Sequence, residues 1–194
     1  RMAEHLSALG IKRDDTILMH SSLSSLGHVE GGAETVIDTL LSVLEDGTLL
    51  IPALSFDSVN AQNPVFSARD TKSCVGAISE YFRTRPGVLR SLHPTHSVCG
   101  IGKNAKEILS RHIETDTPVG ALSPFGLLPR YRGKILMLGC GLCPNTSMHG
   151  VEELTEPPYL YKPERQNFTM IAPDGTKIEK SYRVHNFQNT VQRY

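Results

Sequence analysis

The sequence predicts an α/β fold in which a central mixed, mostly parallel sheet is flanked by helices and carries a small antiparallel C-terminal extension. Short apolar runs, of the kind that buried strands show, alternate with segments of helical periodicity and end in Gly- and Ser-rich turns. After residue 155 the character changes, because prolines punctuate short segments there. The 194 residues suit one domain, with a core at 1–155 and the extension at 156–194.

The composition argues against several classes of protein. The 20 basic residues balance the 20 acidic residues, so no global field points to nucleic acid or to an anionic membrane. No apolar run approaches the roughly 18 residues that a membrane span needs. The four cysteines have irregular spacing and do not suggest a disulfide framework, so we expect a cytoplasmic protein.

The first half of the chain alternates helices and strands. Apolar residues recur at helical spacing in three segments, and two further segments are continuous apolar runs. The expected elements are a helix over 2–10, a strand over 16–20, a helix over 33–44, a strand over 48–54 and a helix over 76–85. Pro52 is expected to mark the end of the second strand, because proline donates no ladder hydrogen bond.

A Ser- and Gly-rich loop connects the first strand to the second helix. It begins with His20, Ser21 and Ser22 and reaches the helix through Gly31 and Gly32. A strand, a small-residue loop and a helix N-terminus together present backbone N–H groups that suit an anion. The loop matches neither the Walker pattern nor Gly-x-Gly-x-x-Gly. Phosphate binding and an ordinary strand-to-helix connection therefore both stay open.

The middle of the chain is less regular. Residues 55–72 are polar and predict a long loop, in which Asp57 is the acid nearest a strand end. A strand at 98–101 and a helix at 105–110 follow the sequence from Ser91 to His96. The tail predicts a hairpin of residues 168–172 and 176–180 around an Asp-Gly turn.

Residues 134–153 carry the best candidate for chemistry. Ile135–Leu138 is an apolar run of the kind that a strand buried on both faces shows, and glycines after it let the chain turn. If a helix starts near Thr146, then His149 and Glu152 lie three residues apart on one face. An imidazole oriented by a carboxylate is the minimal general-base unit. The alternative is a satisfied polar histidine under a loop.

Two groups of residues raise the question of a metal. Cys140 and Cys143 have the spacing of half a zinc site or of a redox motif, but no second pair follows at a zinc-ribbon spacing. His93 and His96 lack a carboxylate or thiolate at ordinary ligand spacing. We therefore expect two thiols in a strand-to-helix loop, two histidines in a pocket wall, and no metal.

These stretches, taken together, resemble the aminoglycoside 3-N-acetyltransferase family. The matches follow one another in the family's order over residues 5–155. They are His20–Gly27, Gly31-Gly32, Gly47–Pro52, Arg90–Ser97, Ser123–Phe125, Leu136–Gly139, Asn145–His149 and Glu152. Each match is weak alone, but their occurrence in the family's order makes a specific signal.

The resemblance implies a mixed α/β fold and transfer of an acetyl group from acetyl-CoA to the 3-amino group of an aminoglycoside antibiotic, a reaction that confers resistance. It implies that His149 is the base, with Glu152 beside it. The residues implied to line the coenzyme A groove are Ser21, Ser22, Gly31, Gly32, Thr35 and Ser91. His93 is implied near the active-site wall, and the acids Asp57 and Glu153 are candidates to attract a polycationic acceptor.

Two departures from the family leave alternatives open. The family is longer, so we expect this chain to be incomplete at its C-terminus. The loop between Pro52 and Gly76 is shorter and less acidic than in resistance enzymes. The alternatives are acetylation of another small amine, a CoA-binding protein without turnover, and a zinc protein that uses Cys140, Cys143 and His149. The expected partners are small molecules, and a homodimer is an open alternative.

Overall fold

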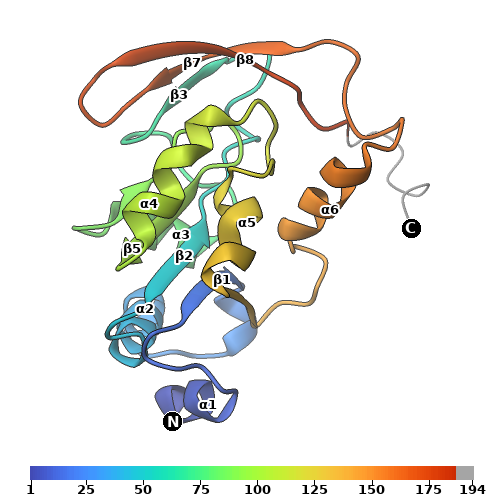
Figure 1. Ribbon diagram of the computed structural model, residues 1–194. Helices are drawn as coiled ribbons and strands as arrows, with labels where there is room; N and C mark the ends of the chain where they lie inside the picture. Colours follow the sequence, from blue (N-terminus) through green and yellow to red (C-terminus); the bar gives the residue numbers. More distant parts are fainter. Residues whose placement is uncertain (187–194) are drawn as a thin grey trace.

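The computed structural model describes residues 1–186 and contains a five-stranded mixed sheet with helices on both faces (Figure 1). The strand order is β4-β5-β2-β1-β6. β1 pairs in parallel with β2 and β6, whereas β5 runs antiparallel to β2 and to β4. The strands are β1 (Thr16–Ser21), β2 (Thr48–Pro52), β4 (Leu89–Arg90), β5 (Val98–Gly102) and β6 (Lys134–Leu138).

Helices cover the sheet and connect its strands. They are α1 (Met2–Ala8), α2 (Gly32–Val43), α3 (Ala77–Thr84), α4 (Ala105–Ser110), α5 (Pro124–Leu127) and α6 (Ser147–Thr155). Short 3-10 turns are η1 (Ser24–Leu26), η2 (Arg111–Glu114) and η3 (Leu128–Tyr131). Within residues 1–186, no helix is long and apolar enough to cross a membrane.

The two central strands bury both of their faces, as their continuous apolar runs predict. On β1, Ile17 and Met19 pack with α1, α2 and α3, whereas Leu18 packs with α4 and α5 on the opposite face. Alternation occurs because successive side chains of a strand point to opposite faces. Each fully buried aliphatic side chain of this kind contributes about 1.5–3 kcal/mol to stability. The functional loops therefore emerge from a rigid base.

Most predicted elements of the core are confirmed within one or two residues. In the first helix Leu6 is buried, but Leu9 is 72% exposed, because the helix ends at Ala8 and Leu9 lies outside the packed face. The two-residue strand β4 was not predicted, since it is too short to show a period.

The prediction that the strand at 135–138 is buried on both faces is wrong for this structure. Among residues 1–186, β6 is an edge strand that pairs only with β1, and Ile135 is 39% exposed. An apolar run predicts a strand, but it does not determine whether the strand has one neighbour or two.

A second sheet of three strands packs beside the core, at the top of Figure 1. The predicted antiparallel hairpin is present as β7 (Gln166–Ile171) and β8 (Lys177–Tyr182). Its third strand, β3 (Val65–Ser67), comes from the segment predicted to be a loop and pairs in parallel with β7. Three residues are too few to show the alternation of a strand. A pairing between segments about 100 residues apart also produces no pattern in the sequence around either segment. This pairing draws segment 53–72 against the C-terminal hairpin.

Candidate active site

The predicted histidine–carboxylate pair is formed on α6. His149 Nδ1 lies 2.6 Å from Glu152 Oε2, and both side chains are 24% exposed. The pair forms because residues three apart share one face of a helix. Hydrogen bonding of Nδ1–H to the carboxylate selects the tautomer in which Nε2 is basic.

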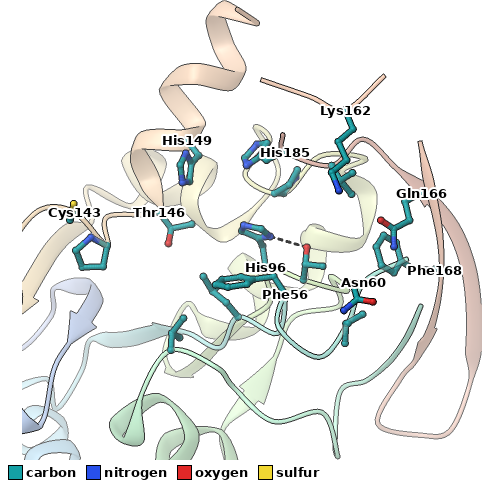
Figure 2. Close-up of a pocket in the computed structure, with 17 residues that line it drawn as sticks. Phe56, Asn60, His96, Cys143, Thr146, His149, Lys162, Gln166, Phe168 and His185 are labelled. Carbon is teal, nitrogen blue, oxygen red and sulfur yellow. Dashed lines mark hydrogen bonds between the residues drawn. The ribbon is translucent and has the colours of Figure 1, made fainter. Parts of the chain in front are cut away.

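His149 lines a cavity of about 500 Å³ between α6, the segment 53–60, the loop before β5 and the C-terminal hairpin (Figure 2). The cavity lies beyond the carboxyl ends of β2 and β6, since residues that follow these two strands line it, and sheets of this class place their sites there. Strand β7 and the loops around the sheet ends line it, among them Phe56, His96, Thr146, Lys162, Phe168 and His185.

A row of histidine rings leads away from the pair. The ring centre of His149 lies 5.2 Å from that of His185, which in turn lies 5.8 Å from that of His96. His185 Nε2 donates to Glu153 Oε1 at 2.8 Å, and only 1% of its side chain is exposed. The site therefore holds a second histidine–carboxylate pair beside the predicted one.

The histidines deeper in the protein are held neutral. His112 is locked between Ser91 Oγ and the carbonyl of Pro118, and burial lowers its pKa to about 3. Burial also lowers the pKa of His93 and of His96 well below the ordinary value, and neighbouring histidines lower both further. Protonation of any of the three would place an unpaired charge in the interior.

These shifts predict a steep loss of stability in mild acid. Because the folded-state pKa of each of these three histidines lies below 6.5, the unfolded chain binds protons that the native protein does not. The free energy of unfolding is therefore fully present above pH 6.5 and should fall by about 1.4 kcal/mol per pH unit for each histidine below it. Urea denaturation at steps from pH 7.5 to 5.0 measures this slope. A flat profile in that window would contradict the neutral assignment.

Two further cavities join this one to the Ser- and Gly-rich loop. A cavity of about 580 Å³ is lined by Ser21, Ser22 and Gly32, together with residues of the segment before α3. A small space of about 60 Å³ at the ends of β1 and β2 shares lining residues with both larger cavities, and Val75 lines all three. The three spaces therefore form one row from the loop to His149.

The turn after β6 packs directly against the Ser- and Gly-rich loop. Gly139 has a positive φ of 71°, and a Cβ there would lie 2.8 Å from the carbonyl oxygen of Ser22. Ser22 N–H donates to the carbonyl of Leu138 at 3.0 Å. The loop that carries His149 and the Ser- and Gly-rich loop are therefore in direct backbone contact.

Not every predicted site residue lines these spaces. Gly31 is the N-cap of α2, and Thr35 is exposed on its first turns. Ser91 and His93 are 2% and 1% exposed and belong to the hydrogen-bonded network around His112. None of these four residues lines any of the three cavities, so the cavities do not support their predicted contacts with coenzyme A or with the acceptor.

Neither of the two predicted acceptor acids lines the cavity of His149. Asp57 is exposed on its loop and does not line that cavity. The Glu153 side chain is only 6% exposed and accepts hydrogen bonds from His185 Nε2 and from Val119 N–H. A solvated helix end was the alternative considered for Glu153, and its burial excludes that alternative.

The cysteines predicted to be free thiols are free. Cys140 and Cys143 form no disulfide, and Cys143 lines the cavity beside Pro144 and Thr146. Burial raises the pKa of the Cys140 thiol. In residues 1–186, no group of three or more His, Cys, Asp or Glu side chains could hold a metal ion.

Sequence reasoning did not identify His185, Lys162, Gln166 or Phe56 as residues of the cavity. All four lie in segments that were described only as a loop or as the tail. His96 was noticed only because it lies three residues after His93, a spacing that fits a metal site or a pocket wall equally well.

Comparisons with known proteins agree with this geometry. The chain is 32% identical over 208 residues to the SPbeta prophage-derived aminoglycoside N(3')-acetyltransferase-like protein YokD of Bacillus subtilis (strain 168), covering 96% of this chain and 75% of that protein. It is 35% identical over 178 residues to aminoglycoside N(3)-acetyltransferase VII of Streptomyces paromomycinus, covering 81% of this chain and 61% of that one.

The structure also resembles that of AAC-IIIb, solved as a binary complex with CoASH, with a TM-score of 0.80 and 28% identity over 95% of this chain and 74% of that one. The family model described as aminoglycoside 3-N-acetyltransferase matches residues 18–193. The chain therefore belongs to the aminoglycoside 3-N-acetyltransferase family.

Proposed function

We propose that this protein transfers the acetyl group of acetyl-CoA to an amine, and that residues 1–194 act as one acetyltransferase domain. The observation that carries the proposal is the His149–Glu152 pair at 2.6 Å, facing a cavity that joins the Ser- and Gly-rich loop. The relatives are named aminoglycoside N(3)-acetyltransferases, which favours the 3-amino group of an aminoglycoside as the acceptor.

The cavity at the loop fits the phosphate-bearing part of coenzyme A. The N-terminus of the twelve-residue helix α2 directs backbone N–H groups toward this side of the protein, and Ser21 and Ser22 add hydroxyl groups. A neighbouring structure of this fold contains CoASH, which supports the same cosubstrate here. The small space at the strand ends would let the acetyl thioester reach His149.

The reaction needs one base. An amine is protonated at neutral pH and must lose a proton before its nitrogen can attack the thioester carbonyl. His149 Nε2 accepts that proton, while Glu152 holds Nδ1–H and stabilises the imidazolium that forms. The new C–N bond forms and the C–S bond breaks, and the CoA thiolate leaves and takes up the second proton, which the nitrogen loses as the neutral amide forms.

Thiol release from acetyl-CoA tests the proposal. With the full chain, release should depend on an added amine and should yield the N-acetylated amine by mass spectrometry. If acetyl-CoA binds but no amine in a broad panel causes release, the protein is a CoA-binding protein and the proposal fails.

A glycine variant tests the position of the cosubstrate in the same assay. Gly31 has a φ of +73°, and a Cβ there would lie 2.3 Å from Thr35 Oγ1, so Gly31→Ala should displace the start of α2. A cost of about 1–2 kcal/mol for a left-handed alanine would raise the KM for acetyl-CoA by about 10-fold. Gly175→Ala is the matched control, since φ is +89° at that hairpin turn and a Cβ would meet nothing within 4 Å.

A further inference from the structure

His20 lies at the carboxyl end of β1, on the face of the sheet that holds the proposed base. Successive side chains of a strand point to opposite faces, so His20 shares a face with Leu18, which packs against α4 and α5. The helix that carries His149, α6, packs against α5. The imidazole of His20 therefore points to the same side of the sheet as that helix.

The small space of about 60 Å³ at the strand ends is bordered by His20. Thr146 borders both this space and the cavity of His149, and the His149 N–H donates to the Thr146 carbonyl at 3.1 Å. Ser21 borders both the small space and the cavity at the Ser- and Gly-rich loop. The volume of the small space is enough for about four water-sized groups, which matches the methyl group, carbonyl carbon, oxygen and sulfur of an acetyl thioester. His20 therefore lies where the acetyl group of the cosubstrate would approach the base.

The imidazole of His20 is buried without a partner. His20 is 7% exposed, and its Nε2 has no hydrogen-bond partner among residues 1–186. Both ring nitrogens of the buried His112, in contrast, lie within hydrogen-bond distance of a partner. A buried polar atom without a partner destabilises the folded protein unless another molecule satisfies it. The Nε2 atom beside the small space is therefore a place where a ligand atom would be bound.

The charge state of His20 makes it a donor and not a second base. Burial lowers its pKa to about 4, so the ring is neutral at neutral pH. A group with so low a pKa holds a proton too weakly to take one from an amine. A neutral imidazole still carries one N–H, which can donate to a carbonyl oxygen on which negative charge develops. The carbonyl oxygen of a thioester is such an atom when an amine attacks.

We infer that the Nε2–H group of His20 donates a hydrogen bond to the carbonyl oxygen of the acetyl thioester and stabilises the oxyanion of the reaction. The amine nitrogen forms a bond to the carbonyl carbon, and the π electron pair of the carbonyl moves to the oxygen. The pair returns as the C–S bond breaks. His20 gives a hydrogen bond throughout and transfers no proton. The inference rests on the proposed function for the identity of the cosubstrate.

Infrared difference spectra of acetyl-CoA, labelled with ¹³C at the thioester carbonyl and bound to the full chain, test the contact without an amine. A hydrogen bond weakens the C=O bond and lowers its stretching frequency. The band should therefore lie at a higher frequency in His20→Leu than in wild type. In His20→Gln it should stay close to the wild-type position, because the amide NH₂ of glutamine can replace the Nε2–H group. The same band position in wild type and in His20→Leu would overturn the inference.

Thiol release with an amine tests the contribution to the rate. His20→Leu should lower kcat by about 10²–10³-fold, the range for one oxyanion donor. Its affinity for CoA should stay unchanged, because CoA has no acetyl carbonyl. His20→Gln should recover a large part of the lost rate. The urea midpoint of His20→Leu should equal or exceed that of wild type, because leucine replaces a polar group that has no partner. A clear drop in the midpoint would show that the imidazole has a structural role instead.

Thr16→Val is the matched control. Thr16 is buried on the same face of the same strand and borders none of the three cavities, so this variant should keep both the rate and the band of wild type. Amine-dependent release with an unchanged kcat in His20→Leu would overturn the inference and leave acetyl transfer standing, with another donor for the oxyanion. A band shift in His20→Leu without release by wild type on any amine would support the contact and overturn acetyl transfer.

Discussion

Replacing His149 by alanine should lower kcat/KM for amine acetylation by about 10²–10⁴-fold, the range that a positioned general base supplies. The imidazole is the group that would take the proton of the amine, and Glu152 lies on its Nδ1 side, behind the basic Nε2. The measurement is thiol release at saturating acetyl-CoA across pH 6–9.

Two comparisons separate a lost base from a damaged fold. Glu152→Gln keeps the shape of the partner and removes its charge, so it should cost less than His149→Ala. Glu164→Gln, at an exposed position, should leave the rate unchanged. Binding of acetyl-CoA should be the same in all variants. If the His149→Ala variant folds and keeps wild-type activity, then His149 is not the base. Another group would then have to take the proton of the amine.

Replacing Arg90 by methionine should have the largest effect on stability. Its guanidinium donates to the carbonyl of Thr71 at 2.5 Å, to that of Ala53 at 3.0 Å and to Ser97 Oγ at 2.9 Å. It also lies 4.7 Å above the ring centre of Phe66, and burial lowers its pKa to about 10. Removing it leaves the Thr71 carbonyl without this donor, so we expect unfolding to become easier by about 2–4 kcal/mol.

Urea denaturation of Arg90→Met measures this loss, with Arg130→Met as the control. Arg130 is exposed, so its removal should change the free energy of unfolding by less than about 0.5 kcal/mol. Because Arg90 ties both ends of segment 53–72, its loss should also weaken acceptor binding at Phe56 and Val59. Equal stability of the two variants would show that the buried guanidinium contributes nothing net.

The features that the sequence determined by itself are local ones. The strands 16–20 and 48–54 and the helices at 33–44 and 76–85 follow from periods of a few residues, and the structure confirms them. The pairing of His149 with Glu152 needed only a helix that starts near Thr146, because a spacing of three then determines which side chains meet. The hairpin of the tail likewise follows from its Asp-Gly turn.

Only the tertiary structure decided what surrounds that pair. β3 joins β7 across about 100 residues, which turns a polar loop into a cavity wall with Phe56 and Asn60. His185 reaches Glu153 from the end of the tail. Ser91 and His93 lie within the matching stretch Arg90–Ser97 but are buried with His112. Among the described residues, β6 has one neighbouring strand, where its apolar run suggested two. Local patterns arise from neighbours within one turn or one strand, whereas these contacts depend on the free energy of packing segments that the chain brings together only once it is folded.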